Sequence, residues 1–309
     1  MGRYVVRRLL QMIPVFIGAT LIVFMMVYAL PGDPVRLLWG EQGVDPAQIA
    51  QKRHELGLDL PLWQQYVNYL TNLLQGDFGE QIASGRPVAD ILTDALPVTI
   101  RLTVIAVTLV VAIGVPMGVF SGLAIGRVVD RTTLVFTLLV ISVPIFVSGY
   151  LLQTVVAINL GWTTPTVQDS TAFSELLLPG FVLALLSLAN VARLSRTSIA
   201  ENRRADYVRT AIAKGLPRRK VVGRHLLRNS LIPVVTYIGI DFGALMGGAI
   251  VTERIFNIQG VGGAIFGAIN AREGSTVVGL VTVLILVYLF VNLIVDLLYA
   301  VLDPRIRYA

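Results

Sequence analysis

The sequence predicts an all-α integral membrane protein that crosses the bilayer six times. Of its 309 residues, 55% are apolar and only 14% are charged, and the mean hydropathy is +0.75. Because roughly a quarter of the residues of a soluble domain are charged, this composition excludes a soluble protein. The apolar residues also form long runs, and the basic residues collect between the runs, as in a multi-pass membrane protein.

Six apolar runs are long enough to cross the membrane, because about 20 helical residues span a hydrocarbon core of about 30 Å. The third run exceeds that length. Pro144 inside it predicts a kink, since proline removes a backbone hydrogen bond from the helix. The predicted spans are residues 9–30, 102–126, 132–160, 176–195, 230–252 and 277–300.

The positions of the basic residues predict that both termini are cytoplasmic. Three arginines precede the first span, two follow the second, and eleven basic residues lie between Arg193 and Arg228. Lys and Arg accumulate on the cytoplasmic side of membrane proteins. We therefore expect the 197–229 segment inside the cell and residues 31–97 outside it.

The residue types limit the chemistry of this chain. It has no cysteine, and its two histidines, His54 and His225, are far apart. We therefore predict no metal site, no cofactor and no catalytic residue. Because no Gly-Lys-Ser/Thr phosphate loop is present, ATP hydrolysis is not expected here. The net charge of +6 lies in loops beside the membrane, which argues against a nucleic-acid partner.

The loop of residues 31–97 is long enough to form a small domain. Asp45 and Pro46 predict the start of a helix and Gly57 its end. A second helix is predicted over 63–74, where apolar residues recur at helical spacing. Two interpretations of its apolar face stay open. The face packs on the protein's own spans or lies in the headgroup layer, or it docks a soluble partner.

Glycines recur four residues apart in the second predicted span, and a shorter pair repeats the pattern in the fifth. Small residues on one helix face let a second helix approach closely. Tight helix packing is therefore favoured over the lining of a pathway. The glycines are Gly114, Gly118, Gly122 and Gly126, then Gly243 and Gly247.

The 197–229 segment carries the clearest pattern outside the spans. Asp206 to Lys214 reads as a short helix, Gly215 as its left-handed stop, and Pro217 as the start of a second helix leading to the fifth span. Such a unit has the shape to enter a cleft on a cytoplasmic partner. Attraction of its basic residues to anionic headgroups is the alternative interpretation.

Several stretches of this segment match a known motif in order. They are Asp206-Tyr207-Val208-Arg209-Thr210-Ala211, then Ala213-Lys214-Gly215-Leu216, then His225, Asn229 and Leu231-Ile232-Pro233. They resemble the coupling loop of ABC importer permeases in the form used by the dipeptide/oligopeptide family. Arg209 stands where many permeases have glutamate, and the interval from Gly215 to Pro233 is longer than usual. Both departures favour the peptide-type branch.

Three further stretches resemble the first, B-type, permease subunit of the same branch. They are Leu30-Pro31-Gly32-Asp33-Pro34, then Gly76-Asp77-Phe78-Gly79 with Pro87-Val88 and Leu96-Pro97, then Glu253-Arg254-Ile255-Phe256-Asn257 with Gly260 and Gly262. Gln81 and Gln259 depart from the family, where serine and proline are common. These two departures bear on the outer loops.

The resemblance implies the type I permease fold of ABC importers. Its parts would be a first transmembrane helix (1–30), an extracytoplasmic helical insertion (31–97) and a five-helix core (98–309) that contains the coupling loop. It implies a bacterial inner-membrane subunit surrounded by lipid. The implied partners are a homologous second permease in a heterodimer, two cytoplasmic ATPases that bind ATP and Mg, an extracytoplasmic solute-binding protein, and a di- or oligopeptide substrate.

The resemblance also assigns residues to roles. It implies ATPase coupling by Asp206, Tyr207, Arg209, Thr210, Ala211, Lys214, Gly215 and Leu216. It implies a place in the pathway or outer gate for Glu253, Arg254, Phe256 and Asn257. Asp241 joins this second group because an ionisable residue in mid-span is costly. It faces a water-filled cavity or pairs within the bundle.

Two sets of alternatives remain at this point. Within the family, nickel complexes, glutathione or another small solute are rival substrates, and no residue selects among them. A stand-alone secondary transporter or channel is an alternative of another class. It should show inverted repeats or a chain of intramembrane carboxylates, and neither is visible in the sequence.

Overall fold

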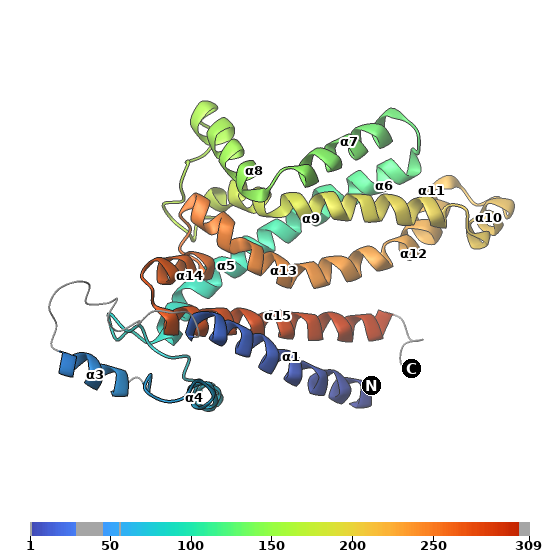
Figure 1. Cartoon of the computed structure of the whole chain (residues 1–309). Helices are drawn as coiled ribbons and strands as arrows, with labels where there is room; N and C mark the ends of the chain where they lie inside the picture. Colours follow the sequence, from blue (N-terminus) through green and yellow to red (C-terminus); the bar gives the residue numbers. More distant parts are fainter. Residues whose placement is uncertain (1, 29–45, 56, 303–309) are drawn as a thin grey trace. The chain divides into compact units, whose positions relative to one another are not determined.

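The computed structural model describes residues 2–28, 46–55 and 57–302, and this part of the chain is almost entirely helical (Figure 1). Contacts divide the chain into two compact units. Unit 1 comprises residues 1–99, 259–293 and 305–309, and unit 2 comprises residues 100–258 and 294–304.

Within its described residues, unit 1 contains three helices that lie wholly in the first 99 residues, parts of two long helices, and one short helix between them. They are α1 (Gly2–Tyr28), α3 (Pro46–Glu55), α4 (Leu62–Leu74), the start of α5 (Val88–Leu109), α14 (Val261–Asn270) and most of α15 (Gly274–Leu302).

Unit 2 continues α5 and contains three π-helical stretches, labelled η, among its α-helices. Its remaining elements are η1 (Val110–Gly114), α6 (Val115–Leu123), α7 (Val128–Ser142), α8 (Ile145–Leu152), η2 (Gln153–Asn159), α9 (Phe173–Asn202), α10 (Asp206–Ala213), α11 (Arg218–Lys220), η3 (Val221–Leu227), α12 (Arg228–Ser230) and α13 (Ile232–Phe256).

Five helices of the described chain are long and apolar enough to cross a membrane, and a bent pair makes up to six. The bent pair is Val128–Ser142 with Ile145–Asn159, whose axes differ by 104°. Val143 and Pro144 between them have extended backbone angles. Proline cannot donate a backbone hydrogen bond and disfavours the helical conformation of the residue before it. The kink predicted at Pro144 is therefore confirmed.

The second span begins earlier than the sequence predicted. Its helix starts at Val88, whereas the apolar run starts at residue 102. The additional turns carry Asp90 and Asp94, so a search for apolar residues alone does not detect them. The helix then continues through η1 into α6 and ends at Leu123.

The predicted glycine packing is confirmed at three positions and wrong at two. A Cβ atom on Gly118 would lie 2.3 Å from the carbonyl oxygen of Ala192 in α9, and the nearest α9 atoms would be 2.7 Å away at Gly122 and 3.1 Å away at Gly114. Gly126 instead has a φ of +78° in the turn after α6, because the helix has already ended. A Cβ on Gly247 would meet no atom of the described chain within 4 Å.

The described part of the insertion contains both predicted helices. α3 begins at Pro46, while its predicted cap Asp45 lies outside the described residues. α4 covers the predicted amphipathic run and is followed by Gly76 with a φ of +82°. Within unit 1, Tyr66 and Tyr69 attach α4 to α1 and α15, so this part of the predicted run packs on the protein's own spans. Trp63, Val67 and Leu74 of the same run are exposed.

A buried carboxylate fastens the rest of the insertion to unit 1. Glu273, 2% exposed before the start of α15, accepts hydrogen bonds from the backbone N–H groups of Ile82 (2.8 Å) and Ala83 (3.0 Å). Ser275 donates to the carbonyl of Glu80 at 2.9 Å. These bonds fix the loop between α4 and α5 against the start of the last span.

Candidate functional site

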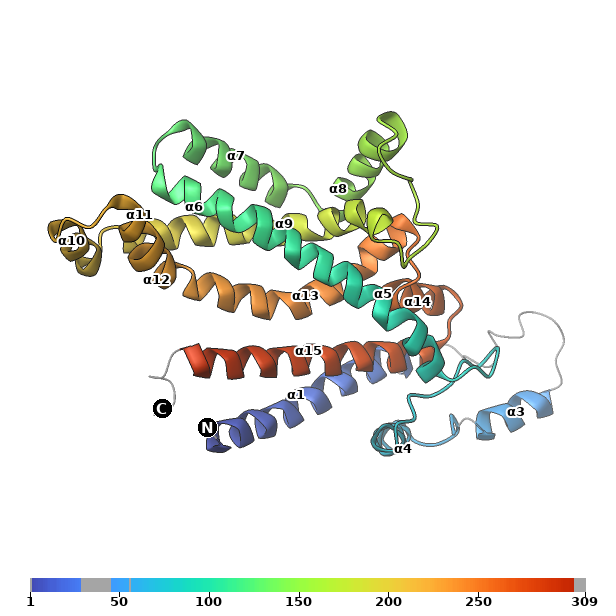
Figure 2. The same cartoon turned by 180° about the vertical axis from the view of Figure 1, so that it is seen from behind.

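The 197–229 segment forms a helix, a glycine turn and a second helical stretch at one end of unit 2, as Figures 1 and 2 show. α10 begins at Asp206, whose negative charge suits the first turn of a helix. Gly215 has a φ of +73°, and its N–H donates to the carbonyl of Ile212. A left-handed residue of this kind ends a helix, so the predicted stop at Gly215 is confirmed.

The inner face of α10 is buried in a small hydrophobic core. Val208 and Ala211 of α10 pack with Ile199 of α9, and Val221 and Leu226 of η3 complete the cluster. Leu216 is half-buried against it. Ala211, one of the residues assigned to ATPase coupling, is therefore buried within its own chain, where it packs α10 onto this core.

The outer face of α10 is open to solvent. The side chains of Asp206 and Arg209 are 98% and 72% exposed, and their charged groups are 3.8 Å apart. Thr210 and Lys214 are exposed as well. Ile212 is 61% exposed on the same short helix, although a lone isoleucine gave no signal in the sequence. A helix with charged groups around an uncovered apolar side chain is suited to contact with a protein surface.

Tyr207 links α10 to the end of α9. Its hydroxyl group donates a 2.6 Å hydrogen bond to the side-chain oxygen of Asn202, whose amide donates to the carbonyl of Ser198. Ser198 in turn donates a 2.7 Å bond to the carbonyl of Ser230 in α12. A chain of polar contacts thus joins α10, α9 and the approach to α13.

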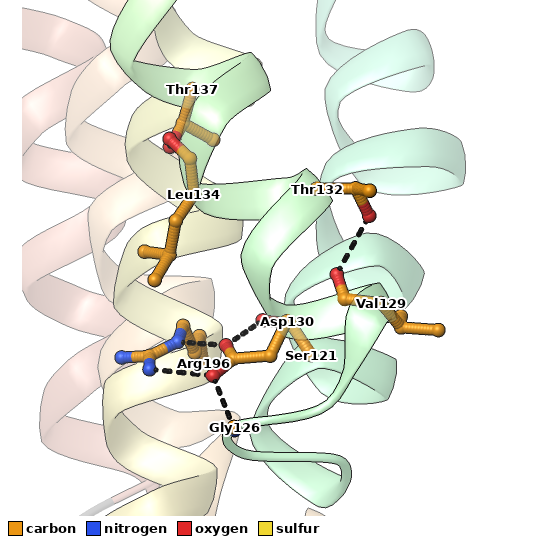
Figure 3. Close-up of polar contacts among 8 residues, drawn as sticks. All are labelled: Ser121, Gly126, Val129, Asp130, Thr132, Leu134, Thr137 and Arg196. Atoms are coloured by element: carbon orange, nitrogen blue, oxygen red, sulfur yellow. Dashed lines mark hydrogen bonds and ion pairs between the residues drawn. The ribbon is translucent and has the colours of Figure 1, made fainter.

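A buried ion pair holds the other side of α9, and Figure 3 shows its geometry. Arg196 of α9 donates two hydrogen bonds to the carboxylate of Asp130 in α7, at 2.5 and 3.0 Å. Ser121 of α6 donates to the same carboxylate at 2.7 Å, and the N–H of Gly126 donates at 2.8 Å. The Asp130 side chain is 4% exposed. Four donors around one buried carboxylate compensate for its loss of water.

This cluster lies close to the 197–229 segment along α9. Arg196 is two turns before the end of α9. Arg203, the residue that follows the end of α9, donates a 3.1 Å hydrogen bond to the carbonyl of Leu123 in α6. Together with the glycine packing, these contacts join α6, α7 and α9 into one base. Sequence reasoning missed it, because Asp130 and Arg196 are 66 residues apart and Arg196 was explained by topology alone.

The structure places Asp241 on α13, half-buried against α9. Its carboxylate interacts with the hydroxyl of Ser187, and Tyr237 one turn earlier interacts with Asn190. Of the two interpretations of Asp241, pairing within the bundle is therefore observed. Its role in a pathway stays a prediction.

The residues assigned to an outer gate divide into two groups at the end of α13. Glu253 and Phe256 are buried, and the N–H of Val167 donates a 2.8 Å bond to the carbonyl of Phe256. Arg254 and Asn257 are exposed, and Asn257 ends the helix in the left-handed conformation. Gln153 also donates to the carbonyl of Ile255 at 3.2 Å. The loop after η2 is thus bonded to the end of α13.

Comparison with known proteins assigns the chain to a family. Residues 114–308 match the family described as binding-protein-dependent transport system inner membrane component, and residues 1–103 match the N-terminal part of the same transport membrane component. The chain belongs to this family of membrane permeases. It is a multi-pass permease component of a binding-protein-dependent transport system.

Several curated relatives align over nearly their whole length. The di/tripeptide transport system permease protein DppB of Pseudomonas aeruginosa is 36% identical, over 99% of this chain and 98% of the relative. The glutathione transport system permease protein GsiC of Escherichia coli K12 is 38% identical over the full length of both. The dipeptide transport system permease protein DppB of the same strain is 37% identical, over 100% of this chain and 99% of the relative.

Proposed function

We propose that this chain forms half of the translocation pathway of an ATP-driven importer of di- or oligopeptides, and that the 197–229 segment couples it to cytoplasmic ATPases. One observation carries the coupling role. The outer face of α10 is exposed at Asp206, Arg209 and Ile212, while its inner face is packed on a base secured by the Asp130–Arg196 pair. A helix fixed in this way transmits a displacement to α9 instead of yielding locally.

The proposed assembly contains a homologous second permease, two ATPases that hold ATP and Mg, and an extracytoplasmic solute-binding protein. The family description supports dependence on a binding protein. The basic residues around α10 and α11 support a cytoplasmic position for the 197–229 segment, with both termini on that side. Closure of the ATPases on ATP would then bias the pathway from inward-facing to outward-facing.

The polar pairs between α9 and α13 are the proposed contribution of this subunit to the pathway. Asp241 with Ser187, and Tyr237 with Asn190, place four polar side chains in the middle parts of two spanning helices. Polar groups at that depth mark solute pathways more often than lipid-facing surfaces. The end of α13, from Glu253 to Asn257, would then border the outer opening.

Peptides are the substrate class that the relatives favour. Two of the three are described as permeases for dipeptides or di/tripeptides, and the third as a permease for glutathione, itself a tripeptide. In vesicles that contain the complete transporter, we expect uptake of a labelled dipeptide that excess unlabelled tripeptide reduces. Uptake of glutathione with no uptake of dipeptides would assign the alternative substrate.

The coupling role is tested by substitutions in the turn and on the exposed face of α10. Gly215→Pro blocks the left-handed turn, and Arg209→Glu reverses an exposed charge. We expect both to lower uptake by about tenfold, which corresponds to about 1.4 kcal/mol, while ATP hydrolysis continues. Gly215→Ala and Arg209→Gln are the matched milder variants and should have smaller effects. Unchanged uptake by Gly215→Pro and Arg209→Glu would disprove the coupling role.

A further inference from the structure

α4 has three distinct faces although it carries no charged residue. The first face is apolar and exposed, since Trp63, Val67 and Leu74 are 69%, 50% and 89% exposed. These positions are four and seven residues apart, so they share one side of the helix. The second face carries Tyr66 and Tyr69. The third face is polar and lies opposite the first, since Asn72 is about half a turn around the axis from Trp63 at about 100° per residue.

The second face of α4, between the other two, is fixed to spanning helices of unit 1. The Tyr66 hydroxyl is 2.9 Å from the hydroxyl of Thr20 and donates to the carbonyl of Ile17 at 2.8 Å. The ring of Phe24 lies against those of Tyr66 and Tyr69, with centroids 5.4 and 6.1 Å away. Burial raises the pKa of Tyr69 to about 12. α4 is therefore held sideways against the span instead of extending away from it.

These contacts define the depth at which α4 lies. Its partners on α1 belong to the apolar span Val5–Tyr28. At 1.5 Å per residue, Phe24, Thr20 and Ile17 are about 6, 12 and 16 Å inside the Tyr28 end of that span. A tyrosine side chain bridges the distance from there to the backbone of α4. The helix thus lies near the edge of the hydrocarbon layer.

The orientation of α4 agrees with that depth. Both views show α4 end-on, while α1 and α15 run across the picture (Figures 1 and 2). A helix that crosses a spanning helix in this way lies along the membrane surface. With its second face on the spans, its first and third faces then point to opposite sides of the surface, one into lipid and one into water.

The surface next to α4 indicates that lipid covers its exposed apolar face. Leu21, Ile22, Met25 and Met26 of α1 are exposed apolar side chains at the same depth as the α4 contacts. We therefore expect acyl chains beside these side chains of α1. Tryptophan is enriched at the boundary between headgroups and hydrocarbon, where an amphipathic ring is favourable.

We propose that α4 is an interfacial helix whose Trp63, Val67 and Leu74 insert among the acyl chains at the Tyr28 end of α1. Because α4 has no charged residue, its insertion depends on apolar contact and not on anionic lipids. This anchoring of α4 in the lipid would hold the extracytoplasmic segment at a fixed height on the membrane. The proposal does not depend on the identity of the substrate.

Tryptophan fluorescence tests the proposal directly. Trp39→Phe with Trp162→Phe leaves Trp63 as the only tryptophan of the chain. The complete transporter, and the same transporter with Trp63→Phe added, are placed in phosphatidylcholine vesicles with bromine near the headgroup end of the acyl chains, and the difference between the two spectra is the Trp63 emission. We expect this emission to be at least about two-fold weaker than in unbrominated lipid, with no change with salt. Bromine near the methyl end of the chains should quench less.

A matched variant on the same helix serves as the control. Trp63→Phe with Asn72→Trp moves the fluorophore to the polar face, and aqueous acrylamide should quench it while brominated lipid should not. Two results would overturn the proposal. Trp63 could be quenched by acrylamide alone, which places it in water. It could also resist both quenchers, which would mean that a protein partner covers it.

Discussion

Two helical regions outside the spans, the 197–229 segment and the insertion, are attached to the spans in different ways. The 197–229 segment sits on a base held by a buried, fully hydrogen-bonded ion pair and by helices in backbone contact at glycine. The insertion is attached by tyrosine hydroxyls, aromatic rings and one buried carboxylate that accepts backbone N–H groups. Ion pairs and close helix contacts resist displacement, so we expect the first region to transmit movement and the second to stay fixed on its spans.

The largest effect should follow from breaking the ion pair. Asp130→Asn leaves Arg196 without a counter-charge in a site where the carboxylate is 4% exposed. Removing one partner of such a pair costs about 3–5 kcal/mol. We expect a lower thermal midpoint of the purified chain and faster hydrogen exchange along α10. The double variant Asp130→Asn, Arg196→Met should recover most of the loss, and if it is no more stable than the single variant, the pair is not the cause.

A smaller loss should follow from adding one methyl group between α6 and α9. A Cβ on Gly118 would lie 2.3 Å from a backbone oxygen, so Gly118→Ala forces the helices apart. Overpacking of this kind costs about 1–3 kcal/mol. Gly247→Ala is the control, because a Cβ there meets nothing within 4 Å in the described chain. Equal melting of the two variants would show that α6 and α9 tolerate separation.

The insertion should respond to a different residue. Glu273→Gln keeps the size of the side chain but leaves it one good acceptor for the N–H groups of Ile82 and Ala83. An unsatisfied buried group costs about 1–3 kcal/mol. We expect faster hydrogen exchange at residues 82 and 83 with no change in α10. A change confined to α10 would reverse the comparison between the two regions.

The smallest effect concerns pH and the exposed end of the insertion. The hydrogen bond to Asp59, 2.8 Å from His54 Nδ1, raises the pKa of His54 above its ordinary value of 6.5. The same hydrogen bond lowers the pKa of Asp59. The stabilising contribution of His54 is therefore complete below pH 6.5, while Asp59 is ionised, and is lost as the pH rises through the higher folded-state pKa.

Magnetic resonance of His54 checks this sign. We expect His54 to titrate above the ordinary histidine value and to return to it in Asp59→Asn. If His54 titrates at the same pH in both proteins, Asp59 does not raise its pKa.

The sequence predicted what depends on local pattern. Apolar length located the spans, Pro144 the break, and Gly215 the end of α10, because each depends on the residue itself and its neighbours along the chain. Gly126 shows the limit of periodicity, since the four-residue spacing continued after the helix had ended.

The long-range interactions that hold the base together, and those that fasten the insertion, were beyond such reasoning. Asp130 is hydrogen-bonded to Arg196, 66 residues away in the sequence, and Glu273 to Ile82, 191 residues away, so only the packing of the helices brings these residues together. A carboxylate at the start of a span was the one signal available for Asp130. Ile212 gave none, because one isoleucine fits a buried or an exposed position equally well.

Photo-crosslinking from the exposed face of α10 is the most direct test of its coupling to an ATPase. A benzophenone side chain at position 212 replaces an isoleucine that is 61% exposed, and position 208, 2% exposed on the buried face, is its control. In the transport-competent complex, we predict that position 212 forms an adduct with an ATPase subunit and position 208 does not. Adducts from position 212 with lipid alone, or equal adducts from both positions, would contradict the account.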